Sequence, residues 1–466
     1  MQLLDNAADV ADRLARRLEI HIRPWLVWNN IYRTTSYLRS ALWMIPLLSI
    51  VLVLAIAPAL RILDGWLAWR LTGLSLSGAQ ALYQTVITLT LSFIVFTFGS
   101  LLVAIQIAGG QLTPRIIATT LLRDNVVRYS VGMFVFTLVF AVMALNRAET
   151  SVHEIVSFVA AGLGIACMAT FLFLIDYAAR LLRPVTILAR VGDEGLAVIA
   201  SVYPRPRRDH EPETSPGAPA PAGPRRVVAH AGRSDFVLAV DLATLVREAR
   251  RHDGIIELMA QVGDYVATGD DLMTLYGGAA AIDDATLQAT VAFGSERTLE
   301  QDPLFGLRII VDIALKALSP AINDPTTAVL AIDQIHRLLR ATGARKLSDD
   351  EILDSGGRRR LIRRTPDWED FVQLACTEIR AYGASNVQVA RRLRAMLDSL
   401  LASLTAGRRP ALEHERDALT RMLPPLYPIP GDLALASMPD PQGLGGSVHR
   451  FRAGRSPASQ RVDETN

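Results

Sequence analysis

The sequence predicts a polytopic α-helical membrane domain with four transmembrane helices, followed by a cytoplasmic α+β domain with a small barrel-sandwich-like β module and C-terminal helices. Half of the residues are hydrophobic, more than an ordinary soluble protein carries, and the excess is concentrated in the first third of the chain. After this apolar part, turn-rich and amphipathic sequence patterns predict the α+β domain. The 48 basic and 46 acidic residues nearly cancel, so the charge balance favours no nucleic-acid partner.

Four uncharged runs are long enough to cross a bilayer. A spanning helix needs about 20 apolar residues, because the hydrocarbon core is about 30 Å thick and a helix rises about 1.5 Å per residue. The second run is too long for one simple span, so we place its membrane part at residues 79–107, with a loop at 75–78 and a break at Gly109 and Gly110. The runs occupy residues 40–60, 71–114, 129–146 and 155–175.

The distribution of arginine predicts the orientation of these helices. Arginines are frequent before the first run, between the second and third runs, and after the fourth. The two opposite connections carry only Arg61, Arg70 and Arg147. Because basic residues accumulate on the cytoplasmic side, we expect both termini in the cytoplasm and the protein in a bacterial inner membrane. The first run follows a long charged segment and has no small-residue cleavage site, so we expect it to stay in the mature protein.

Changes in composition divide the chain into seven segments. The loop and the tail named below are polar and rich in Pro or Gly, with almost nothing apolar to bury, so we expect them to be disordered. The segments are an amphipathic cytoplasmic segment (1–38), the transmembrane domain (39–180), a membrane-proximal connector (181–202), a disordered Pro-rich loop (203–227), the β module (228–280), a helical cytoplasmic domain (281–425) and a disordered tail (426–466).

The β module is predicted from two repeated turns. Gly263-Asp264 and Gly269-Asp270 each precede a short apolar stretch, a rhythm that resembles barrel-sandwich hybrid domains of the lipoyl type. Glycine supplies positive φ in such turns, and aspartate bonds to the turn backbone. Because no lysine stands at the hairpin tip, we expect a structural module and no lipoyl or biotin cofactor.

A dense polar motif follows the β module. Asp302-Pro303 and Asp324-Pro325 each precede an amphipathic run, as expected for an N-cap residue followed by proline in the first helical turn. Capping accounts for both aspartates, although a metal site built from them is an alternative. Arg297 with Gln301 would bind an anion or, as we favour, form a surface or interface salt bridge. We find no nucleophile–base set, phosphate loop or metal-ligand spacing, so we expect neither an enzyme nor a bound cofactor or metal.

These residues resemble a known family. The matching stretches are residues 92–115, Arg123-Asp124, the Gly263-Asp264 turn, and the run from Arg297 through Pro303 to Asn323-Asp324-Pro325. On them, the chain is identified as similar to the bacterial predicted membrane proteins known as domain of unknown function 2254, over roughly residues 40 to 405. The resemblance implies a membrane topology and a structural role for the motif, but no activity.

The second run carries the best functional clue, a helical stripe of small and polar residues. Within a bilayer such a stripe marks either a tight helix–helix contact or a water-filled pathway. If several copies assemble around an axis, the stripe would line a pore, with Phe96 or Val103 as an apolar constriction. The stripe comprises Thr85, Thr88, Ser92, Gly99, Val103, Gln106 and Gly110, and Thr113, Pro114 and Arg115 after it would couple the helix to the cytoplasmic domain.

We therefore expect an oligomeric ion channel or channel-like transport protein with a cytoplasmic vestibule. Its partners would be the lipid bilayer, further copies of the chain and the ions that pass. The rival hypothesis is a membrane-anchored sensor or scaffold, whose cytoplasmic domain binds a ligand or a protein partner and whose helices serve only as an anchor.

Overall fold

The computed structural model describes the chain in segments that divide into two compact units near residue 187. We call them the apolar unit, which ends at Ile187, and the mixed unit, which begins at Leu188 and includes Trp28 and Asn29. The described residues are 28–29, 32, 34–35, 41, 43–67, 73–111, 124–148, 153–181, 183–207, 225–347 and 350–446.

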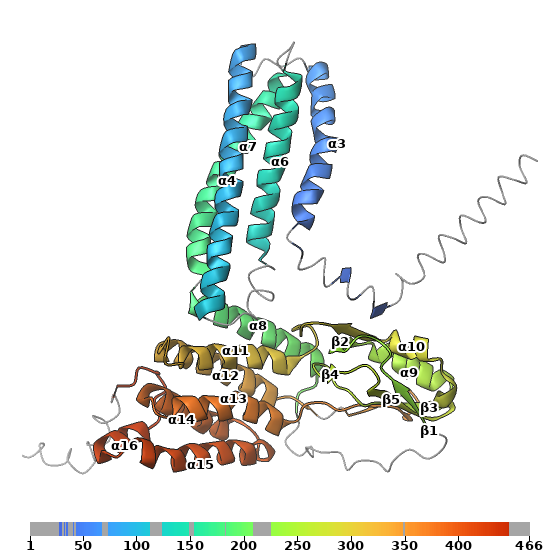
Figure 1. Ribbon diagram of the computed structural model, residues 1–466, viewed down its shortest axis with the longest axis vertical. Coiled ribbons are helices and arrows are strands. Elements are labelled where there is room, and N and C mark those ends of the chain that lie inside the picture. The colour runs from blue at the N-terminus through green and yellow to red at the C-terminus, as the bar shows by residue number, and fades with distance from the viewer. Residues whose placement is uncertain are drawn as a thin grey trace, which may run out of the picture. The chain divides into compact units, whose positions relative to one another are not determined.

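The described part of the apolar unit contains four long helices (Figure 1). They are α3 (Met44–Leu67), α4 (Leu76–Gln111), α6 (Asn125–Arg147) and α7 (Glu154–Leu181). Each is long and apolar enough to cross a membrane, which agrees with the four predicted spans. Half of the most apolar stretch of α6 is buried within the unit, against 12–22% in the others, so α6 is the central helix.

The path of α4 differs from the prediction at both ends. The helix begins at Leu76, inside the predicted loop, and continues through Gly109 and Gly110 to Gln111, so the predicted break is wrong. Glycine inside a helix costs only about 1 kcal/mol relative to alanine. Two glycines at the end of the span therefore need not end the helix.

Two carboxylates fasten the ends of the helices in the apolar unit. Asp64, near the end of α3, accepts a hydrogen bond of 2.9 Å from the backbone N–H of Ile155 in the first turn of α7. Asp124 caps α6 and accepts a 2.6 Å hydrogen bond from the hydroxyl of Tyr177 on α7. Carboxylates are favoured at helix N-termini because unpaired N–H groups and the helix dipole converge there.

The mixed unit contains two separate sheets, so the predicted barrel-sandwich module is wrong. One sheet has the order β1-β5-β3-β8-β7 and the other the order β4-β2-β6, and neither closes into a barrel. The strands are β1 (Arg225–Ala229), β2 (Asp235–Val240), β3 (Gly254–Leu258), β4 (Tyr265–Val266), β5 (Asp271–Gly277), β6 (Val291–Gly294), β7 (Glu351–Leu353) and β8 (Arg359–Ile362).

The predicted turns do form within these sheets. Gly263 and Gly269 have φ values of +95° and +94°. Asp264 accepts a 3.0 Å hydrogen bond from the backbone N–H of Gln261, and Asp270 accepts one of 2.8 Å from that of Ala267. Among the strands beside the turns, β3 and β5 pair with each other in antiparallel fashion and β4 pairs with β2, but β3 also pairs in parallel with β8 from far along the chain. Local sequence patterns cannot reveal that pairing.

Among the described residues from Pro184 onward, nine α-helices accompany the sheets. In Figure 1, α11 to α16 form one group, whereas α9 packs on the five-stranded sheet. The helices are α8 (Pro184–Val202), α9 (Leu242–Arg251), α10 (Asp284–Gln288), α11 (Pro303–Ala317), α12 (Pro325–Gly343), α13 (Trp368–Gly383), α14 (Val387–Ser403), α15 (Arg409–Leu426) and α16 (Pro430–Ala436), with 3-10 turns at Gly278–Ala281 and Ala406–Arg408. Thus the predicted connector is largely helix α8, and the predicted helical domain also contributes β6, β7 and β8.

The stretch predicted as a disordered tail is ordered up to residue 446. It contains α16 and a following segment that Arg391 of α14 holds in place. The Arg391 side chain is buried and donates hydrogen bonds of 3.1 Å to the carbonyl of Met438 and 2.7 Å to that of Gly445. A buried guanidinium requires such acceptors, and the polar segment supplies them from its backbone. Of the predicted Pro-rich loop, residues 208–224 lie outside the described residues, and β1 begins at Arg225.

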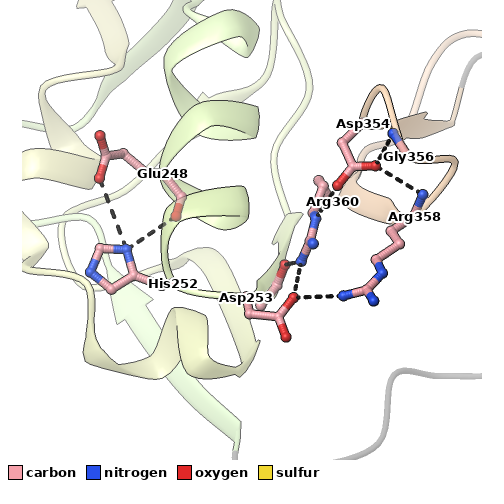
Figure 2. Close-up of polar contacts among 8 residues, drawn as sticks. Glu248, His252, Asp253, Asp354, Gly356, Arg358 and Arg360 are labelled. Carbon is pink, nitrogen blue, oxygen red and sulfur yellow. Dashed lines mark hydrogen bonds and ion pairs between the residues drawn. The ribbon is translucent and has the colours of Figure 1, made fainter.

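An ion-pair network fixes the β7–β8 hairpin to the loop before β3 (Figure 2). The buried Arg360 donates from Nε to Asp354 at 2.8 Å, and its Nη1 lies 2.9 Å from a carboxylate oxygen of Asp253. The other oxygen of Asp354 accepts from the backbone N–H groups of Gly356 at 2.8 Å and Arg358 at 3.0 Å. These bonds, with that of Arg360 first, lower the pKa of Asp354 to about 2.

We expect Asp354→Asn to loosen this hairpin at neutral pH. Because the folded-state pKa is depressed below its ordinary value of about 3.9, the stabilisation is present above about pH 4 and lost as the pH falls through 2. Amide exchange over residues 350–363 should therefore be faster in the variant than in the wild type at pH 7, and the difference should vanish near pH 2. Asp253→Asn, at an exposed partner of the same network, is the control and should have a smaller effect. Equal exchange in variant and wild type at pH 7 would contradict the role of Asp354.

Candidate functional site

The predicted stripe of α4 lies on the surface of the apolar unit. All seven of its residues, from Thr85 to Gly110, are exposed in the single chain. The face that α4 buries is a different one. It consists of Ala79, Tyr83, Val86, Thr90, Phe93, Thr97 and Ala104.

The two faces of α4 point in nearly opposite directions. At 100° per residue, the centre of the stripe lies about 150° around the helix from the centre of the buried face. The stripe is therefore not needed for packing within the chain, which rules out a helix–helix contact inside the described apolar unit as its role. Among the described residues, the stripe therefore faces the exterior of the four-helix group.

The hydroxyl groups of the stripe bond to their own helix. Thr85 donates to the carbonyl of Ala81 at 2.8 Å, and Ser92 donates to that of Thr88 at 2.9 Å. Thr88 does the same toward Gln84. Each hydrogen is thus used inside the helix, while the oxygen retains acceptor capacity toward the exterior. The outer surface of α4 consequently offers hydrogen-bond acceptors without any charged side chain, since α4 contains no Asp, Glu, Lys or Arg.

Both expected constriction residues are exposed on this face. Phe96 is 53% exposed and Val103 is 52% exposed. The ring of Phe96 is held edge-on against Phe171 of α7, with the two centroids 5.3 Å apart. At Gly99 and Gly110 the surface is open, because an added Cβ would meet nothing within 4 Å. The expected coupling residues Thr113, Pro114 and Arg115 lie outside the described residues.

The first half of the polar motif serves the scaffold of the mixed unit. Arg297 donates from Nε to the carbonyl of Gly263 at 2.8 Å, and its guanidinium lies 5.7 Å from the ring centre of Phe236, a cation–π contact. Gln301 accepts a 3.2 Å hydrogen bond from the backbone N–H of Val240. Arg297 and Gln301 thus bind the ends of the three-stranded sheet, whereas we expected an anion or a salt bridge.

The two predicted helix caps are confirmed. Asp302 accepts from the backbone N–H of Phe305 at 3.0 Å at the start of α11, and Asp324 accepts from that of Thr327 at 3.1 Å at the start of α12. Pro303 and Pro325 stand in the first turn of their helices. Asn323 adopts a left-handed conformation with φ of +48°, which asparagine tolerates better than most residues, in the turn between the helices.

Asp302 has a further property that the sequence does not reveal. Its second carboxylate oxygen, Oδ2, is buried and has no hydrogen-bond partner among the described residues. Burial raises the pKa of Asp302 to about 6, although the nearby Arg297 guanidinium opposes the shift. The close approach of the Gly263 turn produces this environment: an ideal Cβ on Gly263 would lie 2.5 Å from Oδ2 and 3.2 Å from Nη2 of Arg297.

The described part of the chain contains no group of three or more His, Cys, Asp or Glu side chains arranged to hold a metal ion. Within the apolar unit, a partly open cavity of about 50 Å³ lies between α4, α6 and α7. Sequence reasoning missed this cavity, because it depends on which helices are neighbours.

Comparison with known proteins identifies relatives of this chain. An uncharacterized protein of Mycobacterium bovis and uncharacterized proteins of two Mycobacterium tuberculosis strains are each 27% identical to this chain over 382 residues, which cover 78% of this chain and 72% of the relative. No solved structure matches the chain. The profile of a family described as "predicted membrane protein", domain of unknown function 2254, matches residues 39–399, which include all four apolar helices and the polar motif, and the chain therefore belongs to that family.

Proposed function

We propose that the protein is an oligomeric ion channel or channel-like transport protein, in which several copies surround an axis lined by the α4 stripe. One observation carries the proposal: the stripe lies on the surface of the apolar unit, turned away from the face that packs within the chain. A polar stripe facing lipid would place the oxygens of Thr85, Thr88 and Ser92 against hydrocarbon, which costs free energy because no donor is available to them there. Further copies around a hydrated axis would remove that cost.

The chemistry of the stripe favours the passage of small ions with little charge selectivity. Hydroxyl oxygens and one amide would replace part of an ion's hydration shell, and α4 supplies no ring of charges. Phe96 and Val103 would narrow the pathway as apolar rings, which block ions by excluding water. Both termini would face the cytoplasm of a bacterial inner membrane, as the arginine distribution predicts.

Two exposed residues of α4 test this proposal. Phe98 and Val103 are similarly exposed in the single chain, at 48% and 52%, but Phe98 lies about 100° around the helix from the centre of the stripe. We expect a charged methanethiosulfonate reagent to reduce ion flux through Val103→Cys in liposomes by about tenfold or more, because a charged adduct would stand in the constriction. Phe98→Cys should keep its flux, since its side chain would face lipid. The native Cys167 and Cys376 are buried, so they need not be removed.

The absence of wild-type flux under any voltage, membrane tension or pH would overturn the channel proposal. Equal block at positions 98 and 103 would instead show that the stripe does not line the pathway.

A membrane-anchored sensor or scaffold is a second proposal, favoured by exposed apolar side chains on the mixed unit. Tyr382, Ile429 and Leu444 are 69%, 61% and 72% exposed, on or near α13 and α16. Gathered into one contiguous patch, such side chains mark a protein-binding surface. Capture of a soluble partner by the full-length chain, lost when these three residues are changed to serine, would support this role. Unchanged capture by the triple variant would count against it.

A further inference from the structure

Two oppositely charged side chains meet at the Gly263 turn without forming a pair. A Cβ built on Gly263 would lie 2.5 Å from Oδ2 of Asp302 and 3.2 Å from Nη2 of Arg297, so both groups converge on the same side of its Cα. Arg297 nevertheless directs its donors to the Gly263 carbonyl, with Nε at 2.8 Å. Oδ2 of the buried Asp302 has no hydrogen-bond partner among the described residues. The closed turn thus holds the guanidinium away from the carboxyl group beside it.

The unpaired oxygen of Asp302 suits a neutral acid better than a carboxylate. Oδ1 accepts a 3.0 Å hydrogen bond from the backbone N–H of Phe305, so the cost of ionisation falls on Oδ2. A buried carboxylate oxygen without donors costs free energy, whereas a carboxylic acid carries its own hydrogen and accepts fewer bonds. Burial accordingly raises the pKa of Asp302 to about 6.

The charged and titratable groups around Asp302 include three from neighbouring segments. Arg297, in the loop before α11, favours the carboxylate, and Asp264, in the turn, opposes it. Tyr203, which follows α8, is buried, and its hydroxyl has no hydrogen-bond partner among the described residues. Burial raises the pKa of Tyr203, and the charge of Asp302 adds to that rise, so the phenol stays neutral. Arg297 is thus the cation with which an ionised Asp302 can pair.

Backbone hydrogen bonds join the turn to β2. The N–H of Gly263 donates to the carbonyl of Val237 at 2.8 Å, and the N–H of Val237 donates to the carbonyl of Asp264 at 2.9 Å. The strand that follows the turn, β4, has two residues and lies at the edge of the three-stranded sheet. Segments with few hydrogen bonds and few apolar contacts open at low cost. The turn can therefore lift while the rest of the mixed unit stays folded.

We propose that Asp302, Arg297 and the Gly263 turn form a pH-sensitive switch within the mixed unit. When Asp302 is protonated, the turn is closed and Arg297 bonds to the Gly263 carbonyl. When Asp302 releases its proton to solvent, the turn lifts, water reaches the carboxylate, and Arg297 leaves the carbonyl to pair with it. The switch lies entirely in the mixed unit, so it rests on neither the channel nor the sensor proposal.

The switch should open as the pH rises. In the closed state the pKa of Asp302 is about 6, whereas in the open, hydrated state it returns to its ordinary value of about 3.9 or below. The closed state therefore binds more protons at Asp302 than the open state does. Its stabilisation is fully present below about pH 4 and is lost as the pH rises through 6.

Hydrogen exchange of the full-length protein in detergent measures this opening. The informative amides are those of Gly263 and Val237, with protection factors corrected for the intrinsic pH dependence of exchange. Amides of α13 report opening of the whole mixed unit. In the wild type, we expect the turn to be less protected than α13 and to lose about tenfold or more of its protection between about pH 4.5 and 7.5.

Two carboxylates of this region allow a matched comparison. Asp302→Asn should make the protection of the turn independent of pH, because the titrating group is removed. Asp264→Asn is the control: asparagine can still accept the hydrogen bond from the backbone N–H of Gln261, and the wild-type response to pH should remain. Equal protection of the turn and α13 at every pH would show that the turn opens only with the whole unit and would overturn the proposal. A pH response that persists in Asp302→Asn would overturn it as well.

A second variant tests the exchange of partners by Arg297. At about pH 5 the closed state holds Asp302 mostly protonated, so a charge interaction with Arg297 operates in the open state. Arg297→Gln weakens the closed turn in either background, but it removes the ion pair of the open turn only where Asp302 is present. It should therefore speed exchange at Gly263 less in the wild type than in Asp302→Asn, by up to about fivefold. Equal acceleration in the two backgrounds would show that no such pair forms.

Discussion

Gly263→Ala is expected to destabilise the mixed unit by about 3 kcal/mol or more, whereas Gly269→Ala should cost only about 1 kcal/mol. The two glycines have nearly the same φ, +95° and +94°, so both variants carry the same backbone strain. They differ in surroundings. A Cβ at position 263 would lie 2.5 Å from Oδ2 of Asp302, but at position 269 it would meet nothing within 4 Å. The difference between the variants therefore measures the crowding around Asp302.

Cys376 provides the measurement. Its thiol is fully buried in α13, and burial raises its pKa, so it reacts only when the mixed unit opens. Labelling of Cys376 in the full-length protein, in detergent and in increasing urea, should begin at a much lower urea concentration in Gly263→Ala than in Gly269→Ala. Cys167 in the apolar unit is the internal control and should label as in the wild type. Similar Cys376 labelling in both variants would show that the Gly263 turn accommodates the added Cβ without a loss of stability.

Asp302→Asn is expected to stabilise the mixed unit by up to about 3 kcal/mol at pH 8. Asparagine caps helices as well as aspartate does, so the cap of α11 is retained while the buried charge is removed. The magnitude follows from the pKa of Asp302, which rises from an ordinary value of about 3.9 to about 6, at 1.36 kcal/mol per pH unit.

The stability difference between wild type and Asp302→Asn is expected to grow as the pH rises. Between about pH 4 and 6 the folded state binds more protons at Asp302 than the unfolded state does. The relative stabilisation of the folded state is therefore fully present below pH 4 and lost as the pH rises through 6. Wild type and Asp302→Asn should be equally stable near pH 4 and differ most above pH 7.

Labelling of the Cys376 thiol also measures this difference in stability. Each labelling rate is normalised to that of the denatured chain at the same pH. Asp302→Ala is the companion variant: it also removes the charge but loses the cap, so it should fall below Asp302→Asn by about 1 kcal/mol at every pH. A pH-independent difference between wild type and Asp302→Asn would mean that the carboxylate is hydrated in the folded protein.

The sequence was sufficient for features that depend on neighbouring residues. The four spans follow from uninterrupted apolar runs, and the caps at Asp302 and Asp324 follow from the Asp-Pro pairs before amphipathic runs. The turns at Gly263 and Gly269 also formed as predicted. Each depends on chemistry within a few residues, or on the absence of water from the bilayer core.

Features set by distant segments could not be predicted in this way. The β3–β8 pair joins residues about a hundred positions apart, and it replaces the expected barrel. Nothing near Asp302 in the sequence shows that the Gly263 turn covers its carboxylate. The α4 stripe was predictable only in part. Its helical periodicity can be read from the sequence, but the sequence does not show that the stripe faces away from the chain's other helices.

The hydrogen bonds that Arg391 donates to the segment after α16 determine where the chain can be shortened. Its guanidinium is enclosed by backbone oxygens at Met438, Gly445 and Gly446, and Asp440 folds that segment by accepting from the N–H of Gly445 at 2.7 Å. A stop codon placed before Met438 would leave the buried Arg391 guanidinium without these acceptors. A stop codon placed after Gly446 would keep all of these hydrogen bonds. Affinity tags and fusion partners therefore belong beyond residue 446.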